Sequence, residues 1–131
     1  MNAVAELSAS FPAMSNDSIG KVQRLQSVAM QADQAQTETH HTLHAGMYAR
    51  TMTLPAGHVL VGALVRVETI VIFNGDADVF VGEGMIRLTG HHVIPADAMR
   101  KQVFIAHADC SITAVFATDA ETVEEAEDEA T

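Results

Sequence analysis

The stretch that decides the fold runs from Pro55 to Gly75 and reads Pro55-Ala-Gly-His-Val-Leu-Val-Gly-Ala-Leu-Val-Arg-Val-Glu-Thr-Ile-Val-Ile-Phe-Asn-Gly75. It is rich in β-branched residues and is interrupted by glycine and proline, a composition typical of short strands separated by turns. Asn74-Gly75 is the pair best able to take the positive φ angles of a tight hairpin, so we expect a turn there.

The same pattern extends outward on both sides and covers residues 44–118. Eight short runs are predicted to be strands: Met47–Leu54, His58–Val67, Thr69–Phe73, Asp78–Val81, Met85–Leu88, His92–Ile94, Gln102–His107 and Ser111–Phe116. Short strands with turns every eight to twelve residues favour a β-sandwich or barrel over alternating strands and helices.

Residues 1–43 differ in composition and are rich in Ala, Ser and Gln. The cluster Ser15–Ser18 offers oxygens that cap a helix start, and apolar residues then recur at the helical period as Ile19, Val22, Leu25 and Val28. We predict a helix from about Ile19 to Ala35, followed by a linker that reaches residue 43. The narrow apolar stripe must pack on the barrel or on another subunit, because a short isolated helix is marginal in water.

Residues 119–131 form a short acidic segment at the C-terminal end. Thr118 and Glu121 have the spacing of a capping box, which predicts a short helix to about Glu127. The acidic residues that follow oppose the negative end of the helix dipole. We therefore expect the last turn to fray and the charge run to be a solvated tail.

The length and composition of the chain limit the functions that it can have. At 131 residues, 48% apolar, the chain fits one domain. Seventeen acidic and seven basic side chains give a net charge of −10, and the basic residues are scattered, which argues against direct nucleic-acid binding. Cys110 is the only cysteine, and we interpret it as a small buried residue at a strand start. No apolar run is long enough for a membrane span, so we expect a soluble protein made in a cytoplasm.

Seven histidines raise the hypothesis of a metal site, but their spacing gives it little support. Neighbouring strand residues point to opposite faces, so each adjacent pair supplies at most one ligand. The best-placed pair is Glu68 with His107, and a third ligand would have to be His41 or His92. No phosphate loop, nucleophile elbow or dinucleotide motif is present, so no catalytic residue is predicted.

Several segments together resemble the small cupin-like proteins encoded by tailed phages and prophages. They are Gly46-Met-Tyr-Ala-Arg-Thr-Met-Thr-Leu-Pro-Ala-Gly57, Gly62-Ala-Leu64, the Gly90 to Pro95 region, Ala106-His-Ala-Asp109 and Ala117-Thr-Asp-Ala-Glu121, and the likeness covers roughly residues 17–128. The resemblance implies a mainly β, cupin-like jelly roll or small β-barrel with an N-terminal helix and a short C-terminal helix.

The resemblance also implies a metal site, and this chain departs from it. Members typically carry His-x-x-Glu-His where this chain has Val65-Arg66-Val67-Glu68-Thr69. The residue matching His107 would complete the site. Two imidazoles are thus replaced by Val65 and Thr69, side chains that pack well inside a sheet but do not bind metals.

Two main functions follow from this comparison, and a third is weaker. The first is a structural protein of a tailed-phage virion, made in the host cytoplasm: a homo-oligomer without metal whose helical stripe contacts other phage proteins. The alternative is a metal-dependent cupin enzyme or a small-ligand-binding protein that uses Glu68 and His107 with a divalent transition metal. The third is an acidic decoy for a host nucleic-acid-binding protein.

Overall fold

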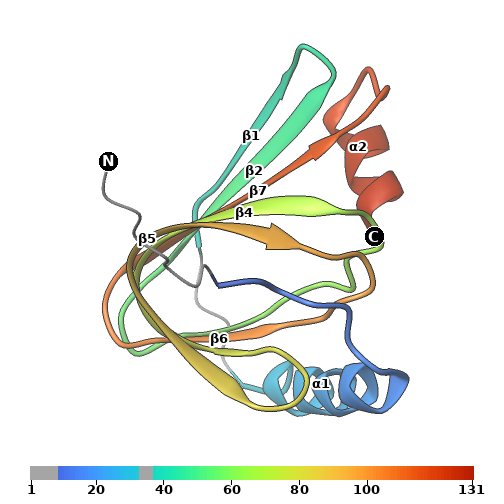
Figure 1. Cartoon of the computed structure of the whole chain (residues 1–131). Coiled ribbons are helices and arrows are strands. Elements are labelled where there is room, and N and C mark those ends of the chain that lie inside the picture. The colour runs from blue at the N-terminus through green and yellow to red at the C-terminus, as the bar shows by residue number, and fades with distance from the viewer. Residues whose placement is uncertain (1–8, 33–36) are drawn as a thin grey trace, which may run out of the picture.

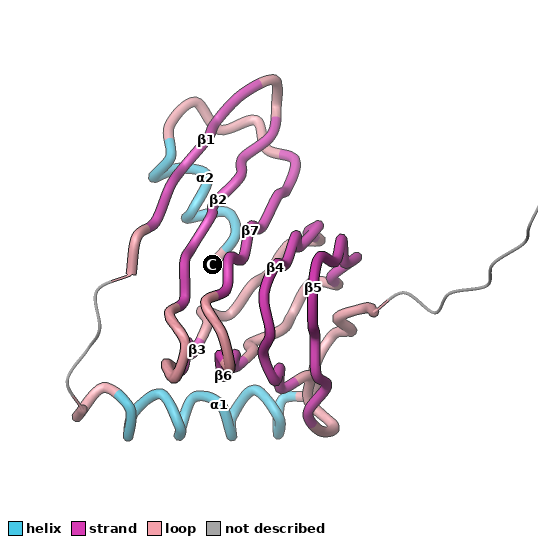
Figure 2. Tube along the Cα trace, turned by 90° about the vertical axis from the view of Figure 1, so that its left-hand side faces the viewer, coloured by secondary structure: helices cyan, strands magenta, loops and turns pink. Residues whose placement is uncertain are grey.

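The fold is one curled antiparallel sheet with a helix near each end of the chain (Figures 1 and 2). The structure is a computed structural model and describes residues 9–32 and 37–131. Its elements are α1 (Asn16–Ala29), β1 (Thr39–His44), β2 (Met47–Leu54), β3 (Val59–Val61), β4 (Thr69–Phe80), β5 (Met85–Ala96), β6 (Val103–Ala106), β7 (Cys110–Ala117) and α2 (Val123–Ala130). The predicted mainly β class with two terminal helices is confirmed.

The sheet curls because β4 changes its partner halfway along. The strands follow the order β1-β2-β7-β4-β6-β3, while β5 pairs with β4 over its whole length. The first half of β4 pairs with β7 over Ile70–Asn74, and the second half pairs with β6 over Ala77–Phe80. Figure 1 shows the result, with β1, β2 and β7 above the opening of the curl and β6 below it.

Gly75 lies at this change of partner, and the predicted hairpin at Asn74-Gly75 is wrong. Gly75 has φ 138° and faces Gly90 of β5, so both strands bend there without ending. A Cβ atom at Gly75 would lie 2.6 Å from the Cys110 sulfur, closer than atoms can pack. The glycine therefore permits a close approach of two strands and does not make a turn. For the same reason the four short strands predicted between Thr69 and Ile94 are two long ones.

Alternate residues of β4 supply much of the core. Its buried residues are Thr69, Val71, Phe73, Ala77 and Val79, all on one face of the strand. Phe73 stacks on Phe104 of β6 at a ring separation of 6.4 Å, and Phe11 contacts the same ring edge-on. The predicted strand at His58–Val67 is mostly irregular, since only Val59–Val61 forms a strand. Cys110 begins β7 and is buried, as expected.

Helix α1 is capped as predicted, and half of its apolar stripe is buried. The Ser15 side chain accepts a hydrogen bond from the Ser18 amide, 3.1 Å away. Ile19 and Val22 pack with Met14 and Val103 against the sheet, but Leu25 is 44% exposed and Val28 is 65% exposed. The helix ends at Ala29 and not at Ala35, and residues 33–36 lie outside the described residues. Within the described residues no helix is long and apolar enough to span a membrane.

The last part of the predicted linker is strand β1, which pairs with β2 along its whole length. Its sequence, Thr-His-His-Thr-Leu-His, has too few apolar residues to give a strand signal. The pairing is fixed instead by the turn at Ala45-Gly46, where both residues have positive φ, as a two-residue hairpin requires.

Helix α2 begins four residues later than predicted, and its last turn is anchored. Thr122 caps it by accepting from the Glu125 amide, whereas the Thr118 hydroxyl donates to the Glu129 carboxylate, 2.6 Å away. Ala130 is buried, and its carbonyl accepts a hydrogen bond from the Arg66 amide at 2.7 Å. The acidic segment is therefore not simply a solvated tail.

Candidate functional site

The interior of the curl holds a cavity of about 230 Å³ between the sheet and α2. Most of its lining is apolar. The lining residues are Tyr48, Arg50, Met52, Gly62, Ala63, Val65, Thr69, Val71, Arg100, Gln102, Phe104, Ile112, Ala114, Phe116, Glu127, Ala130 and Thr131. On β2, β4 and β7 these are alternate residues, as expected for one face of a pleated sheet.

The register of three strands explains why space remains there. Arg50 of β2 pairs with Ala114 of β7, and Ala114 pairs with Val71 of β4. The small side chain of Ala114 stands between the two larger ones and leaves the interior unfilled. In the neighbouring row, Met52 of β2 is paired with the larger Ile112 of β7.

Tyr48 connects the sheet to α2 at the wall of the cavity. Its ring is buried against Phe116, and its hydroxyl donates to Glu127 Oε1 at 3.2 Å. The Nδ1 atom of His41 lies 2.6 Å from the same hydroxyl. Burial, with the negative charge of Glu127 and its hydrogen bond, raises the pKa of Tyr48 to about 12, so the phenol is neutral at physiological pH.

Three residues of the cavity lining each carry a buried N–H donor that has no hydrogen-bond partner within the described residues and almost no accessible surface. The donors are Arg50 Nε, Arg100 Nε and Gln102 Nε2. The Arg100 side chain is only 2% exposed and Gln102 7%. A buried donor without a partner costs about 1–3 kcal/mol. Such groups are uncommon in native proteins.

Arg100 keeps its charge despite its burial. Burial lowers the pKa of its guanidinium to about 10, while the nearby carboxylates of Glu68 and Asp97 act in the opposite direction. One amino group, Nη1, donates to the backbone carbonyl of Asp97 at 2.7 Å. At neutral pH the cavity wall therefore carries a positive charge with an unused Nε–H.

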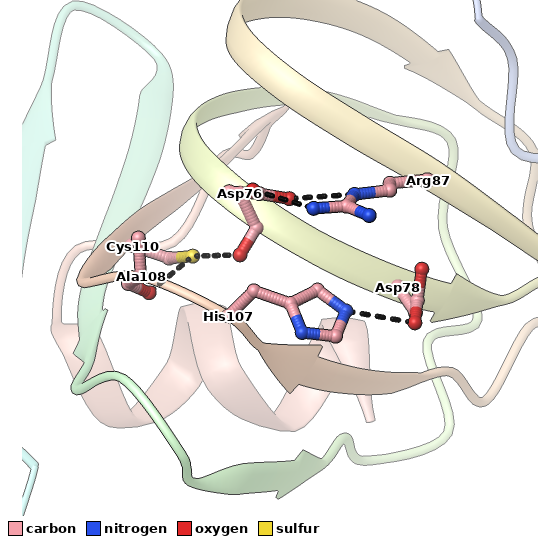
Figure 3. A network of polar contacts seen from close by, with 6 residues as sticks. All are labelled: Asp76, Asp78, Arg87, His107, Ala108 and Cys110. Carbon is pink, nitrogen blue, oxygen red and sulfur yellow. Dashed lines mark hydrogen bonds and ion pairs between the residues drawn. The ribbon is translucent and has the colours of Figure 1, made fainter.

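The residues considered for a metal site do not line the cavity. His107 Nε2 lies 2.8 Å from Asp78 Oδ2 on the outer surface, beside the Asp76–Arg87 ion pair (Figure 3). His92 Nε2 contacts the Thr89 carbonyl, and Glu68 is exposed just before β4. His41 contacts Tyr48 from outside the lining. Across residues 9–32 and 37–131, no three His, Cys, Asp or Glu side chains form a group that could hold a metal ion.

The lining itself does not suit a metal ion. Val65 and Thr69 do face the cavity, but its lining contains no histidine, cysteine or aspartate and only one glutamate, Glu127. Two guanidinium groups on the same wall repel a cation. Zinc sites use three or four protein ligands, so the side chains of this lining do not fit a metal ion.

Sequence reasoning missed Arg50, Arg100 and Gln102, because the basic residues are scattered along the sequence and form no cluster in it. One signal was available for Arg50, which alternates with Tyr48 and Met52 along a predicted strand and so shares their face. Gln102 carried a similar signal, because it begins the predicted strand Gln102–His107 and alternates with Phe104. Nothing local marks Arg100, whose burial depends on the irregular segment 62–68 that lies against it.

Comparisons with known proteins identify the fold. No protein-family profile and no curated protein matches the sequence. A cupin superfamily protein from Desulfitobacterium hafniense is similar in structure, with a TM-score of 0.55 and 13% identity over 67% of this chain and 83% of that one. Ectoine synthase from P. lautus gives a TM-score of 0.53 at 15% identity, covering 76% of each chain.

An enzyme chain of greater length contains a similar barrel. A variant of salicylate 1,2-dioxygenase from Pseudoaminobacter salicylatoxidans matches with a TM-score of 0.55 and 12% identity, over 88% of this chain and 36% of that one. At these identities the likeness concerns architecture alone. The chain has the cupin fold, with a curled antiparallel sheet whose hollow is bordered by its C-terminal helix.

Proposed function

We propose that the protein binds a small organic molecule inside its barrel and does so without a metal ion. The observation that carries this proposal is the cavity of about 230 Å³, whose lining is largely apolar yet includes the polar side chains of Arg50, Arg100 and Gln102. Ligand sites in proteins usually combine apolar walls with a few convergent polar groups.

The size of the cavity limits the ligand. A cavity of about 150 Å³ holds one benzene ring, so this cavity suits a single ring with substituents or a short branched chain. The salicylate dioxygenase structure was also determined in complex with gentisate, a small organic molecule, which supports this choice by analogy of fold.

The residues of the cavity wall also support binding without a metal ion. Val65 and Thr69 stand where the resemblance to phage cupin-like proteins implies histidines, and both line the cavity. The site is thus a former metal site by this proposal, and Glu68 and His107 have no part in it because both lie outside the lining. Within the described residues the lining holds one hydrogen-bonded pair of hydroxyl and carboxylate, Tyr48 with Glu127. The pKa of Tyr48, raised to about 12, keeps that phenol neutral and a poor nucleophile, so we propose a binding protein and not an enzyme.

The test is a screen of small ring compounds by protein-observed NMR. We expect shifts at lining residues such as Ile112 and Phe116 at millimolar compound or below. Ala114→Leu fills the space between Arg50 and Val71 and should abolish these shifts. Ala49→Leu is the control: Ala49 precedes Arg50 on β2 but does not line the cavity, so this change should leave the shifts in place. If no compound produces localised shifts, or if Ala114→Leu binds as well as the parent chain, the proposal fails.

We also propose, as a second candidate, the structural role in a tailed-phage virion. The supporting observation is the exposed second half of the α1 stripe, where Leu25, Val28 and Met30 are 44%, 65% and 66% exposed. A groove of about 250 Å³ lies beside it, lined by Leu25, Phe80 and Met85 among others. Such a face suits a neighbouring subunit of a homo-oligomer or another phage protein.

Proteomics of purified particles tests this role. The chain should be present at a fixed, stoichiometric copy number, and replacing Leu25 and Val28 with Ser should remove it from particles. Particles that lack the chain would eliminate the virion role without affecting the ligand-binding proposal.

A further inference from the structure

The three unpartnered groups of the cavity are all donors. Arg50 Nε, Arg100 Nε and Gln102 Nε2 each carry hydrogen and cannot accept a hydrogen bond in this state. A ligand that satisfies them must therefore present acceptor atoms, and small movements of the surrounding side chains must expose the donors to it. The three residues line one small cavity, so a single group with several acceptors suits them.

The charge of the wall selects an anion. Arg50 and Arg100 each carry a positive charge, and burial in a low-dielectric setting makes a matching negative charge more favourable than it is in water. The carboxylate in the lining, Glu127, is already engaged by the Tyr48 hydroxyl at 3.2 Å and lies 3.4 Å from His41 Nδ1. Glu68 and Asp97 act on Arg100 from outside the lining.

The apolar character of the remaining wall favours one kind of anion. Val71, Phe104, Ile112 and Phe116 offer only apolar surface, which suits a hydrocarbon body and disfavours a fully hydrated ion such as phosphate. A carboxylate has two acceptor oxygens in a plane, the arrangement that a guanidinium binds best.

We infer that the cavity takes a small organic carboxylate, its carboxylate bound by Arg50, Arg100 and Gln102 and its hydrocarbon body held by the apolar wall. This inference rests on the proposed function, since it names the class of ligand for the same cavity. It needs no metal and no chemical step.

Benzoate is the probe for the test, and benzamide and benzyl alcohol are its neutral counterparts of similar size. Titration of the full chain by NMR, with isotope-labelled arginine Nε–H and glutamine side-chain amides, observes the three donors directly. We expect benzoate to bind about tenfold or more tightly than either neutral compound, because hydrogen bonds to charged groups are the stronger kind. Benzoate should also shift the Nε–H signals of Arg50 and Arg100.

Arg100→Met keeps much of the side-chain length and removes the charge, so it should lower benzoate affinity about tenfold and leave benzyl alcohol binding unchanged. Arg50→Met is the second variant in case the first fails to fold, with the same expectation. Arg24→Met is the matched control, since Arg24 lies on the exposed side of α1, away from the cavity, and should bind benzoate as the parent does.

The outcomes separate the two proposals. Equal affinity for benzoate and the neutral compounds would overturn the carboxylate inference and leave the binding function standing. Tighter binding of inorganic phosphate than of benzoate would also overturn it. No binding by any of the ring compounds would overturn both proposals together.

Discussion

The hydroxyl of Tyr48 on β2 donates a hydrogen bond to the carboxylate of Glu127 on α2, across 79 positions of sequence and 3.2 Å of space. The His41 ring of β1 lies parallel to the Tyr48 ring, 6.0 Å away, so the same residue also ties the first hairpin to the helix. This contact holds α2 over the cavity, and it can be followed because Tyr48 is the only tyrosine and the chain has no tryptophan.

Tyr48 should lose its phenol proton at a higher pH than an ordinary tyrosine does. Its pKa is raised to about 12 from an ordinary value of 10.0, first by burial and then by Glu127. A tyrosinate absorbance titration should therefore show its midpoint well above that of the urea-unfolded chain. A midpoint near 10 in samples that keep folded circular dichroism would contradict the buried, hydrogen-bonded phenol.

The same pKa shift predicts how the stability of the fold changes at high pH. Between pH 10 and 12 the unfolded chain loses the phenol proton while the folded chain keeps it, so the folded state binds more protons. The stabilisation is complete below pH 10 and is lost as the pH rises towards 12. Urea midpoints measured across this range should fall, and Tyr48→Phe should reduce the fall.

Glu127→Gln should lower the pKa of Tyr48 without returning it to 10. The change removes the negative charge beside the phenol, but burial, the largest cause of the shift, remains. Glu124→Gln, on the exposed side of the same helix, is the control and should leave the tyrosinate midpoint in place. Identical midpoints for Glu127→Gln and the parent would show that the two side chains are not in contact.

Gly75→Ala should destabilise the protein by about 2–4 kcal/mol. The new Cβ would meet the Cys110 sulfur at 2.6 Å and the Asp109 carbonyl at 2.9 Å, at a φ of 138° that other residues rarely adopt. Gly84→Ala meets no atom within 4 Å and should change the unfolding free energy by less than about 0.5 kcal/mol. Urea denaturation measures both, and a near-neutral Gly75→Ala would mean that the bend of β4 lies elsewhere.

Val22→Ala and Val28→Ala separate the two halves of the α1 stripe. Val22 is 2% exposed, so its truncation should cost about 2 kcal/mol of unfolding free energy. Val28 is 65% exposed, and the same change should have little effect, since alanine is also the better helix former. Equal losses in urea denaturation would show that the whole stripe is covered.

The elements that sequence reasoning predicted well are those with a local cause. The bounds of β2 were correct because alternation and the flanking glycines mark it on both sides. The capping cluster of α1 was also correct, because Ser15 caps the helix by itself, although the helix begins at Asn16 and not at Ile19. The polar strand β1 was missed because its pairing is determined by the Ala45-Gly46 turn and by β2, not by its own composition. Asn74-Gly75 was misread because a glycine that allows close packing and a glycine that makes a turn look alike in sequence.

The sequence by itself determined a mainly β chain with a capped helix before it, because strand alternation and helix caps act between residues a few positions apart. Only the tertiary structure decided that Arg50, Arg100 and Gln102 share one cavity while Glu68 and His107 do not. Those positions come together because β4 bends at Gly75 and α2 folds back over β2. Burial and unmet hydrogen bonds are properties of that assembly, and no single segment carries them.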